Sequence, residues 1–264
     1  MKMVHVAKDR IPPAPKILGH NDRPTYAAPP APKAPPPAPK SSSAKGLVIP
    51  PDWTFKDRSV ADNFEQHVNE QLPFYPLASG MVAHFGRAYL PEGGRMYDLG
   101  ASTGNITNML RSEIEKRNVK AVSIDSSPQM MDVWHGVGDF VTADIRTFSY
   151  LPYDFGVCFL TLMFLPVVDQ RILFNDLYDK LRPGGALVIF ERTAQRSGYL
   201  STVVNRLTLA GKIANGVPAE DIVAKELSLS GAQRPIEDPE HMFNENTHEV
   251  FRFGDFAGWV ATKL

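Results

Sequence analysis

The spacing of apolar residues changes several times after residue 52. Residues 57–71 and 76–89 place apolar side chains three and four positions apart, which predicts two amphipathic helices. The same spacing over 105–117, with Ile106 and Leu110 among its apolar positions, predicts a third helix. Short apolar runs lie between the helical segments, and they predict strands at 95–100, 120–125 and 139–145.

The alternation of strand and helix patterns continues through the next fifty residues. The run "FGVCFLTLMF" at 155–164 is predominantly apolar, which is typical of a strand buried on both faces. A helical pattern follows from Asp169 to Leu181, and Pro183-Gly184-Gly185 should end it. The run "ALVIFE" at 186–191 predicts a fifth strand.

The last part of the chain has a different rhythm. Residues 198–229 have a helical composition, and "HEVFRFGDFAGWVATKL" predicts two strands joined tightly around Gly254 and Asp255. Strands that alternate with helices pair in parallel through right-handed crossovers. We therefore predict an α/β fold with a mostly parallel sheet, helices on both faces and a carboxyl-terminal antiparallel hairpin.

Proline and charge separate the first fifty residues from the rest. Thirteen of the 23 prolines lie in residues 1–51, in strings such as "APPAPKAPPPAPK". Residues 1–46 carry eight basic and two acidic side chains, whereas the remaining residues carry 20 basic and 27 acidic ones. A segment so rich in proline cannot form a ladder of backbone hydrogen bonds, because proline has no backbone N–H. We expect a disordered Pro-, Ala- and Lys-rich basic arm over 1–50 and a folded domain over 52–264, and composition leaves open a Pro-rich docking ligand in the arm.

Composition also excludes several classes of protein. The acidic folded part argues against a domain whose main activity is binding the phosphate backbone of nucleic acids. Cys158 is the only cysteine, so there is no internal disulfide and no multi-cysteine zinc site, and no metal is expected. No apolar run is long enough to span a bilayer, and the amino terminus lacks a secretory signal. We predict a cytoplasmic protein without a membrane partner.

The stretch "RMYDLGASTGNIT" places a glycine turn between a strand and a helix. It lacks the Lys that a phosphate-binding P-loop requires, and Ser102 stands where a dinucleotide-binding turn has its middle glycine. Asp98 precedes the turn formed by Gly100 and Gly104, and a carboxylate there would repel a pyrophosphate. An acid in this position favours a cationic ligand such as S-adenosylmethionine, which carries an ammonium and a sulfonium.

Two more acids follow the next two predicted strands. Asp125 lies 25 residues past Gly100, where a carboxylate can accept hydrogen bonds from both ribose hydroxyls. Asp144 can accept from the adenine amino group, while the backbone N–H of Ile145 reaches a ring nitrogen. Taken singly, each acid is more often a helix cap or a turn residue. Their spacing from the glycine turn, with "LRPGGALVIFE" downstream, predicts an S-adenosylmethionine site at the carboxyl edge of the sheet.

The chain from Asp52 onward resembles the class I methyltransferase family, and more narrowly its carboxy-S-adenosylmethionine synthases, which support wobble-uridine modification in tRNA. The resemblance rests on "DWTFKDRSVADNF", "LPFYPLASGM", "YDLGASTGNIT", "IDSSPQMM", "ADIR", "LTLMFL", "LYDKLRPGGALVIFER" and "FRFGDFAGWVATK". It implies a Rossmann-like fold, a helical cap insertion over 197–235 and a second copy of the chain as a dimer partner. It also implies cofactor contacts from Tyr75, Gly100, Ala101, Ser102, Asp125, Ser126, Asp144 and Ile145.

Two pocket positions depart from the pattern of these synthases. Phe159 stands where they carry an asparagine, and Glu226 stands where they carry the arginine that pairs with the extra carboxylate of the modified cofactor. A glutamate would repel a carboxylate that an arginine holds with two hydrogen bonds. We therefore expect S-adenosylmethionine as the cofactor, with weak binding of its carboxylated form.

Three hypotheses for the function follow. The first is an S-adenosylmethionine-dependent methyltransferase whose acceptor, an RNA or a protein among the candidates, is not identified by the sequence; no catalytic residue is assigned, and Cys158 is expected in the core. The second is a carboxy-S-adenosylmethionine synthase, which requires another basic residue, such as Lys225 or Arg234, to hold the carboxylate. The third is a scaffold that has kept the cofactor fold. Three strand-end acids argue against the third, because clustered carboxylates repel one another.

Overall fold

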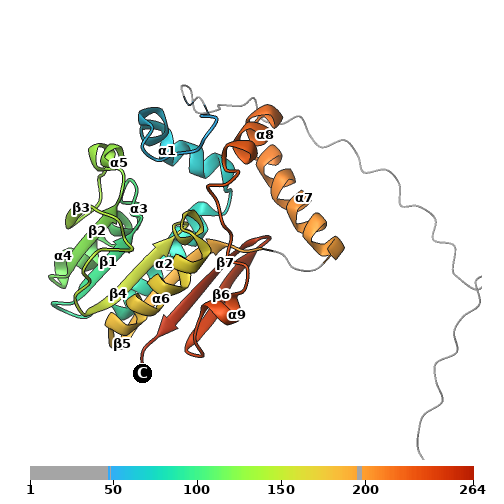
Figure 1. The fold of residues 1–264 in the computed structure, drawn as a ribbon. Coiled ribbons are helices and arrows are strands. Elements are labelled where there is room, and N and C mark those ends of the chain that lie inside the picture. Colours follow the sequence, from blue (N-terminus) through green and yellow to red (C-terminus); the bar gives the residue numbers. More distant parts are fainter. Residues whose placement is uncertain (1–46, 48, 195–197) are drawn as a thin grey trace, which may run out of the picture. The chain divides into compact units, whose positions relative to one another are not determined.

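A seven-stranded sheet runs through the part of the chain that the structure, a computed structural model, describes, namely residues 47, 49–194 and 198–264 (Figure 1). Its order is β3-β2-β1-β4-β5-β7-β6. The strands pair in parallel from β3 to β5, and β7 pairs antiparallel with both β5 and β6. In chain order the strands are β1 (Arg95–Leu99), β2 (Lys120–Asp125), β3 (Asp139–Thr142), β4 (Tyr153–Phe159), β5 (Leu181–Arg192), β6 (Thr247–Phe253) and β7 (Phe256–Thr262).

Helices lie between and around the strands. In chain order they are α1 (Arg58–Gln71), α2 (Tyr75–Tyr89), α3 (Asn105–Met109), α4 (Arg111–Lys116), α5 (Pro128–Val133), the 3-10 turn η1 (Leu162–Phe164), α6 (Val167–Lys180), α7 (Gly198–Ala214), α8 (Ala219–Ser228) and α9 (Pro239–Met242). The predicted α/β fold with a carboxyl-terminal hairpin is confirmed. The arm predicted over 1–50 lies outside the described residues, apart from residues 47, 49 and 50.

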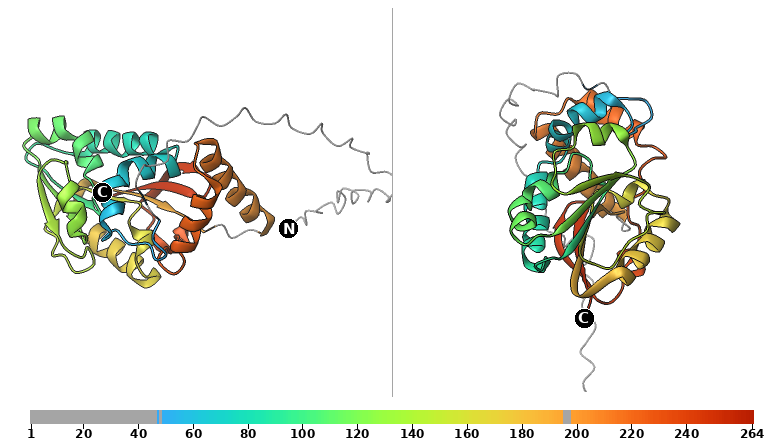
Figure 2. Two further views of the ribbon diagram at one scale, coloured as in Figure 1. Left: turned by 90° about the horizontal axis from the view of Figure 1, so that it is seen from above. Right: turned by 90° about the vertical axis from the view of Figure 1, so that its left-hand side faces the viewer.

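Both faces of the sheet are covered, so most strand residues are buried. One face packs against α2, α3 and α4, through Val82, Ile106 and Leu110 among others. The other face packs against α6 and α9, through residues such as Phe174 and Met242. Figure 2 shows these two helical layers on either side of the sheet when it is seen along its edge. Cys158 is fully buried in this core, as expected of a packing residue.

Three connections join the amino-terminal segment to the helices that precede the hairpin. The backbone N–H of Trp53 donates to the carbonyl of Ser228 at the end of α8 (3.0 Å). The side-chain amide of Asn215, just after α7, donates to the carbonyls of Asn69 and Glu70 (3.0 and 2.7 Å). These carbonyls belong to the last turn of α1, where no further helical N–H can reach them. The segments before and after the central strands are thereby held together over the carboxyl edge of the sheet.

Several predicted boundaries are wrong, and each has a local cause. The strand predicted over 155–164 ends at Phe159, because Leu160 adopts a positive φ of 58° and η1 follows. The helix predicted over 105–117 is broken at Leu110 into α3 and α4. Helices α5 and α9 were not predicted, since both are too short to show a period.

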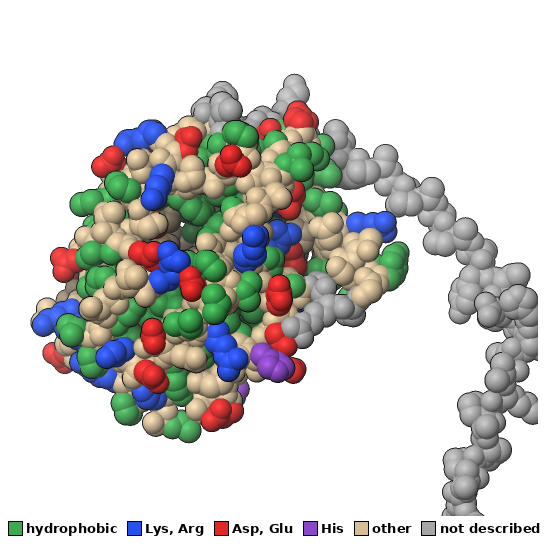
Figure 3. Space-filling view, viewed as in Figure 1, with side chains coloured by type: hydrophobic (Ala, Val, Ile, Leu, Met, Phe, Trp, Pro, Cys, Tyr) green, Lys and Arg blue, Asp and Glu red, His purple; other side chains and the backbone are tan. Residues whose placement is uncertain are grey.

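The surface of the described residues carries both signs of charge. On the face drawn in Figure 3, Lys and Arg side chains are interspersed with Asp and Glu side chains. None of the helices in the described ranges has the length and apolar character that a membrane span requires.

Candidate cofactor and acceptor site

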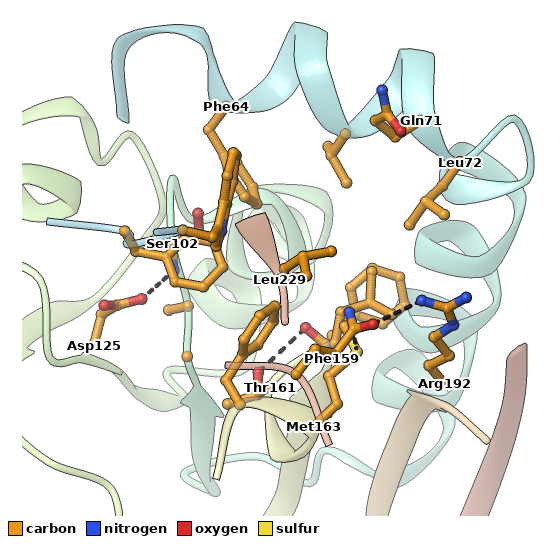
Figure 4. A pocket seen from close by; sticks show the side chains of 18 of the residues that line it. Phe64, Gln71, Leu72, Ser102, Asp125, Phe159, Thr161, Met163, Arg192 and Leu229 are labelled. Atoms are coloured by element: carbon orange, nitrogen blue, oxygen red, sulfur yellow. Dashed lines mark hydrogen bonds between the residues drawn. The ribbon is translucent and has the colours of Figure 1, made fainter. Parts of the chain in front are cut away.

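One pocket lies at the carboxyl ends of β1, β2 and β4, where the connections from β1 and β4 leave in opposite directions. Helix α1 covers it from above, with Phe64 pointing into it, and α8 contributes Leu229 from just beyond its end (Figure 4). Of the twelve residues that the sequence nominated, eleven line this pocket: Tyr75, Asp98, Gly100, Ala101, Ser102, Asp125, Ser126, Asp144, Ile145, Phe159 and Glu226.

The glycine turn brings the backbone close to the loop that follows β4. Gly100 has a φ of 68°, and a Cβ there would lie 2.5 Å from the side chain of Thr161, so a side chain at this position would clash. Gly104, the twelfth nominated residue, does not line the pocket. It is the residue before α3, with a φ of 87°, and a Cβ would lie 2.5 Å from the indole nitrogen of Trp134. Its role is to let the turn pack against the segment after α5.

Asp98 is a buried carboxylate that forms no ion pair with any residue the structure describes. It is 2% exposed, and its Oδ2 has no hydrogen-bond partner among the described residues. Burial and the charge of Asp125 raise the pKa of Asp98 to about 7. A buried polar atom of this kind needs a partner. A cationic ligand in the pocket would supply one, so the donor set fits the ammonium and sulfonium of S-adenosylmethionine.

Asp125 is held in place by backbone N–H groups. Its Oδ2 accepts from Ser102 and its Oδ1 accepts from Ser127, both at 2.9 Å. Burial raises the pKa of Asp125, and these hydrogen bonds oppose the rise. The bond to Ser102 links the loops after β1 and β2 (Figure 4). Each carboxylate oxygen keeps a lone pair for a ligand hydroxyl.

Asp144 forms a chelate with an arginine that the sequence reasoning did not consider. The guanidinium of Arg146 donates to both oxygens of Asp144, at 3.0 and 3.1 Å through Nε, and it also reaches Asp169 of α6 at 2.8 Å. These hydrogen bonds lower the pKa of Asp144. The carboxylate is thus ionised and fixed, and it remains at the pocket wall together with Arg146.

The far end of the pocket is aromatic on one side and charged on the other. The rings of Tyr75 and Phe159 lie 5.3 Å apart, and burial raises the pKa of the Tyr75 hydroxyl. Opposite them, Glu226 accepts from Lys212 Nζ at 2.9 Å, and Arg192 lies 3.8 Å from its other oxygen. Glu226 therefore belongs to a cluster of cations, whereas the sequence reasoning considered its negative charge alone.

Comparisons with known proteins agree with this geometry. The family model of the methyltransferase domain matches residues 96–185. A carboxy-S-adenosyl-L-methionine synthase of Wolinella succinogenes is 30% identical over 221 residues, which make up 78% of this chain and 92% of that protein. The chain belongs to the class I S-adenosylmethionine-dependent methyltransferase family.

Further relatives give the same result. A carboxy-S-adenosyl-L-methionine synthase of Staphylococcus epidermidis is 27% identical over 225 residues, 81% of this chain and 98% of that protein. Among solved structures, human N-acetylserotonin methyltransferase in complex with S-adenosylmethionine superposes with a TM-score of 0.52 at 14% identity, over 79% of this chain and 57% of that one. That similarity concerns the fold alone.

Glu191 organises the loop after β4 of this methyltransferase fold, and the sequence reasoning missed it. Its buried carboxylate accepts three backbone hydrogen bonds, from Thr161 (2.8 Å), Leu162 (2.6 Å) and Met163 (3.2 Å). Burial raises the pKa of Glu191 to about 8, against the effect of these hydrogen bonds. The residue is the penultimate one of β5 and follows a run of apolar side chains, and only the pairing of β4 with β5 brings it to this loop.

Lys212 and Lys225 also belong to the pocket; the sequence reasoning gave Lys212 no role and named Lys225 only as a basic residue that could hold a carboxylate. They are only 6% and 8% exposed, and both line the pocket. Lysines are almost never this buried unless they are paired. The only sequence signal that a lysine within a helical segment is buried is the presence of apolar residues on the same face of the helix.

Proposed function

We propose that the chain transfers the methyl group of S-adenosylmethionine to an acceptor that enters beside Phe159 and the cationic end of the pocket. The proposal rests on one observation: Asp98 is buried beside Asp125, and its Oδ2 has no hydrogen-bond partner within the described part of the chain. Two acids that repel each other in a covered crevice are stabilised by a cation. S-adenosylmethionine brings two cationic groups to it.

In this proposal each nominated residue has a task at the cofactor. Asp98 faces the ammonium end, and Asp125 accepts hydrogen bonds from the ribose hydroxyls. Asp144 and the backbone of Ile145 take the adenine edge, with Arg146 fixing the carboxylate. Tyr75, Gly100, Ala101, Ser102 and Ser126 form the surrounding wall.

The cofactor, when bound, supplies a methyl group already activated by its sulfonium. What the chain must do is hold the acceptor in line with it and keep water away. Phe64 and Phe159 line the pocket as apolar walls, and α1 covers it. No residue is assigned as a base, since methyl transfer from a sulfonium needs at most a weak one.

A second candidate function is the synthesis of carboxy-S-adenosylmethionine. Its support is the name of the 30% identical relative, together with Lys212 and Lys225 close to Glu226. These lysines could hold the carboxylate that Glu226 alone would repel. Either function accommodates a homodimer and an RNA or protein acceptor. The mixed charge on the face in Figure 3 does not favour an extended contact with phosphates there.

Native mass spectrometry of the purified full-length protein tests the proposal. We expect S-adenosylmethionine or its demethylated product to co-purify or to bind on addition, and Asp98→Asn to weaken the complex. Detection of the carboxylated cofactor at higher occupancy would favour the second candidate. If neither form binds at millimolar concentration, the cofactor site is refuted and the scaffold hypothesis replaces it.

A further inference from the structure

Helix α1 carries two buried polar side chains on the face that lines the pocket. His67 and Gln71 are one helical turn apart, so they lie on the same side of α1, and both line the pocket. They are only 7% and 8% exposed. Figure 4 shows Gln71 on the helical side of the pocket, along with Phe64 and Leu72, opposite Phe159. We call His67 and Gln71 the polar pair.

The hydrogen bonds of the polar pair are not completed by the protein. Nε2 of His67 and Oε1 of Gln71 are buried atoms, and neither has a hydrogen-bond partner among the residues that the structure describes. Most buried side-chain polar atoms have such a partner, because a buried donor or acceptor without one is destabilising. Two such atoms on one face of a helix, both at a pocket, indicate that a ligand supplies the missing partners.

The backbone that carries the polar pair is fixed. The side-chain amide of Asn215 donates to the carbonyls of Asn69 and Glu70, which lie between His67 and Gln71 in the sequence (3.0 and 2.7 Å). The N–H of Leu72 donates to the carbonyl of Val68 (2.9 Å) and so completes the last turn of α1. The two polar groups are therefore held in place before a ligand arrives, which lowers the entropic cost of binding it.

The polar pair favours an uncharged ligand group. Burial, and then the charges of Lys225 and Lys212, lower the pKa of His67 to about 3, so its imidazole is neutral at pH 7. A neutral imidazole can donate from Nε2, whereas Oε1 of Gln71 can only accept. A carboxylate has no hydrogen to donate to Gln71, and a cation would meet the two lysines of the pocket. A hydroxyl fits both partners, because it donates one hydrogen bond and accepts another.

Aromatic rings line the same pocket as the polar pair. Phe64 lies on the same face of α1, and Tyr75, Phe159 and Phe256 line the pocket from α2, β4 and β7. The rings of Tyr75 and Phe159 lie 5.3 Å apart. Aromatic walls pack well against a flat ring, in offset or edge-on contact. A pocket with apolar walls and a few polar groups that fix orientation suits a small molecule of this shape.

We propose that His67 and Gln71 bind a hydroxyl of the methyl acceptor, so that the substrate of this enzyme is a small uncharged molecule with a hydroxyl on an aromatic ring. The inference rests on the proposed function, because it takes the bound molecule to be the methyl acceptor. The hydroxyl donates to Oε1 of Gln71 and accepts from Nε2 of His67. One edge of the ring is then fixed under α1, and the aromatic walls limit its orientation toward the cofactor, as in-line transfer requires.

Calorimetry on the full-length protein saturated with S-adenosylhomocysteine tests this inference. Phenol is the probe, and fluorobenzene is a counterpart of nearly the same shape that cannot donate a hydrogen bond. We expect phenol to bind at least about fivefold more tightly than fluorobenzene at pH 7.5, because fluorobenzene leaves Oε1 of Gln71 without a donor. Benzoate and benzylamine carry a negative and a positive charge at this pH, and both should bind more weakly than phenol.

Variants of the polar pair separate ligand binding from packing. Gln71→Leu and His67→Phe remove the polar atoms and keep side chains of similar size. Each should lower the ratio of phenol affinity to fluorobenzene affinity, and the double variant should bring it to about one. Gln66→Leu is the matched control, since it makes the same change at an exposed position of α1, and it should keep the wild-type ratio. If a variant does not fold, the wild-type ratio decides.

Several results would overturn the inference. Equal affinity of the wild type for phenol and fluorobenzene, or a ratio that the double variant leaves unchanged, would show that the polar pair does not bind a hydroxyl. Tighter binding of benzoate or benzylamine than of phenol would show that the ligand is charged. If none of the four compounds binds at millimolar concentration, the acceptor is not a small aromatic molecule. Failure to bind S-adenosylhomocysteine would instead refute the proposed function on which the inference rests.

Discussion

Replacing Asp98 by Asn probes the electrostatic strain between the two acids of the crevice. Burial, and then the charge of Asp125, raise the pKa of Asp98 from 3.8 to about 7. An acid whose pKa is higher in the folded chain lowers the free energy of unfolding as the pH rises. The destabilisation is absent below about pH 4 and complete above about pH 7. A difference of that size corresponds to about 4 kcal/mol. Since Asp98 and Asp125 titrate as a pair, we assign about half of it, ~2 kcal/mol, to Asp98.

Asp98→Asn removes this penalty while keeping the shape of the side chain. We expect the melting temperature of the ligand-free protein to rise by about 4–8 °C at pH 8, and by much less at pH 4.5. The same variant should lose at least about tenfold in affinity for S-adenosylmethionine, because the attraction for the cation is gone. Thermal unfolding at four pH values and calorimetry measure the two effects.

A matched control is Asp139→Asn, which removes an exposed carboxylate at the start of β3. It should change neither the melting temperature nor the affinity. The reasoning fails if Asp98→Asn is no more stable than the wild type at pH 8, because Asp98 would then carry no penalty. It also fails if the affinity is unchanged, because the cation would then bind elsewhere.

Three further substitutions or deletions test other parts of the structure. Asp125→Ala should weaken S-adenosylmethionine binding by roughly 1.5 to 3 kcal/mol in calorimetry, since it removes charge-assisted hydrogen bonds, and unchanged affinity would contradict the site. Glu226→Arg removes the partner of Lys212 and adds a cation, so competition binding should show weaker S-adenosylmethionine and stronger carboxy-S-adenosylmethionine, each by about 1 kcal/mol. If it alters neither, Glu226 does not act on the ligand. Deleting residues 1–46 should leave melting temperature and cofactor affinity nearly unchanged, as expected for an arm without a packed core, and a loss of many degrees would refute that expectation.

The sheet and the glycine turn could be predicted because their signals are local. Apolar runs such as 120–125 and 186–191 predict strands, and their regular alternation with helices predicts that these strands pair in parallel. The acids at the strand ends were found for the same reason, since carboxyl ends of parallel strands meet at one edge. The end of β4 was missed because the apolar run continues past Phe159, while the backbone turns at Leu160.

The charged end of the pocket could not be predicted from local patterns. Arg192, Lys212 and Lys225 lie on three separate elements, and only the packing of α7 and α8 over the sheet brings them together. Glu226 lines the pocket, but its effect depends on Lys212, which is one of many lysines in the sequence. Charge pairs between residues far apart in the sequence produce no periodic pattern and no motif, so only the folded structure shows them.

The two hydrogen bonds from Asn215 to the last turn of α1 affect how fast ligands can leave the pocket. Because α1 covers the pocket and α8 is tied to Trp53, we expect the two sides of the cover to open together. For a ligand that leaves through this cover, the residence time would then depend on how often the cover opens. Amide exchange in the last turn of α1 and at the end of α8 should therefore slow down together when the pocket is filled.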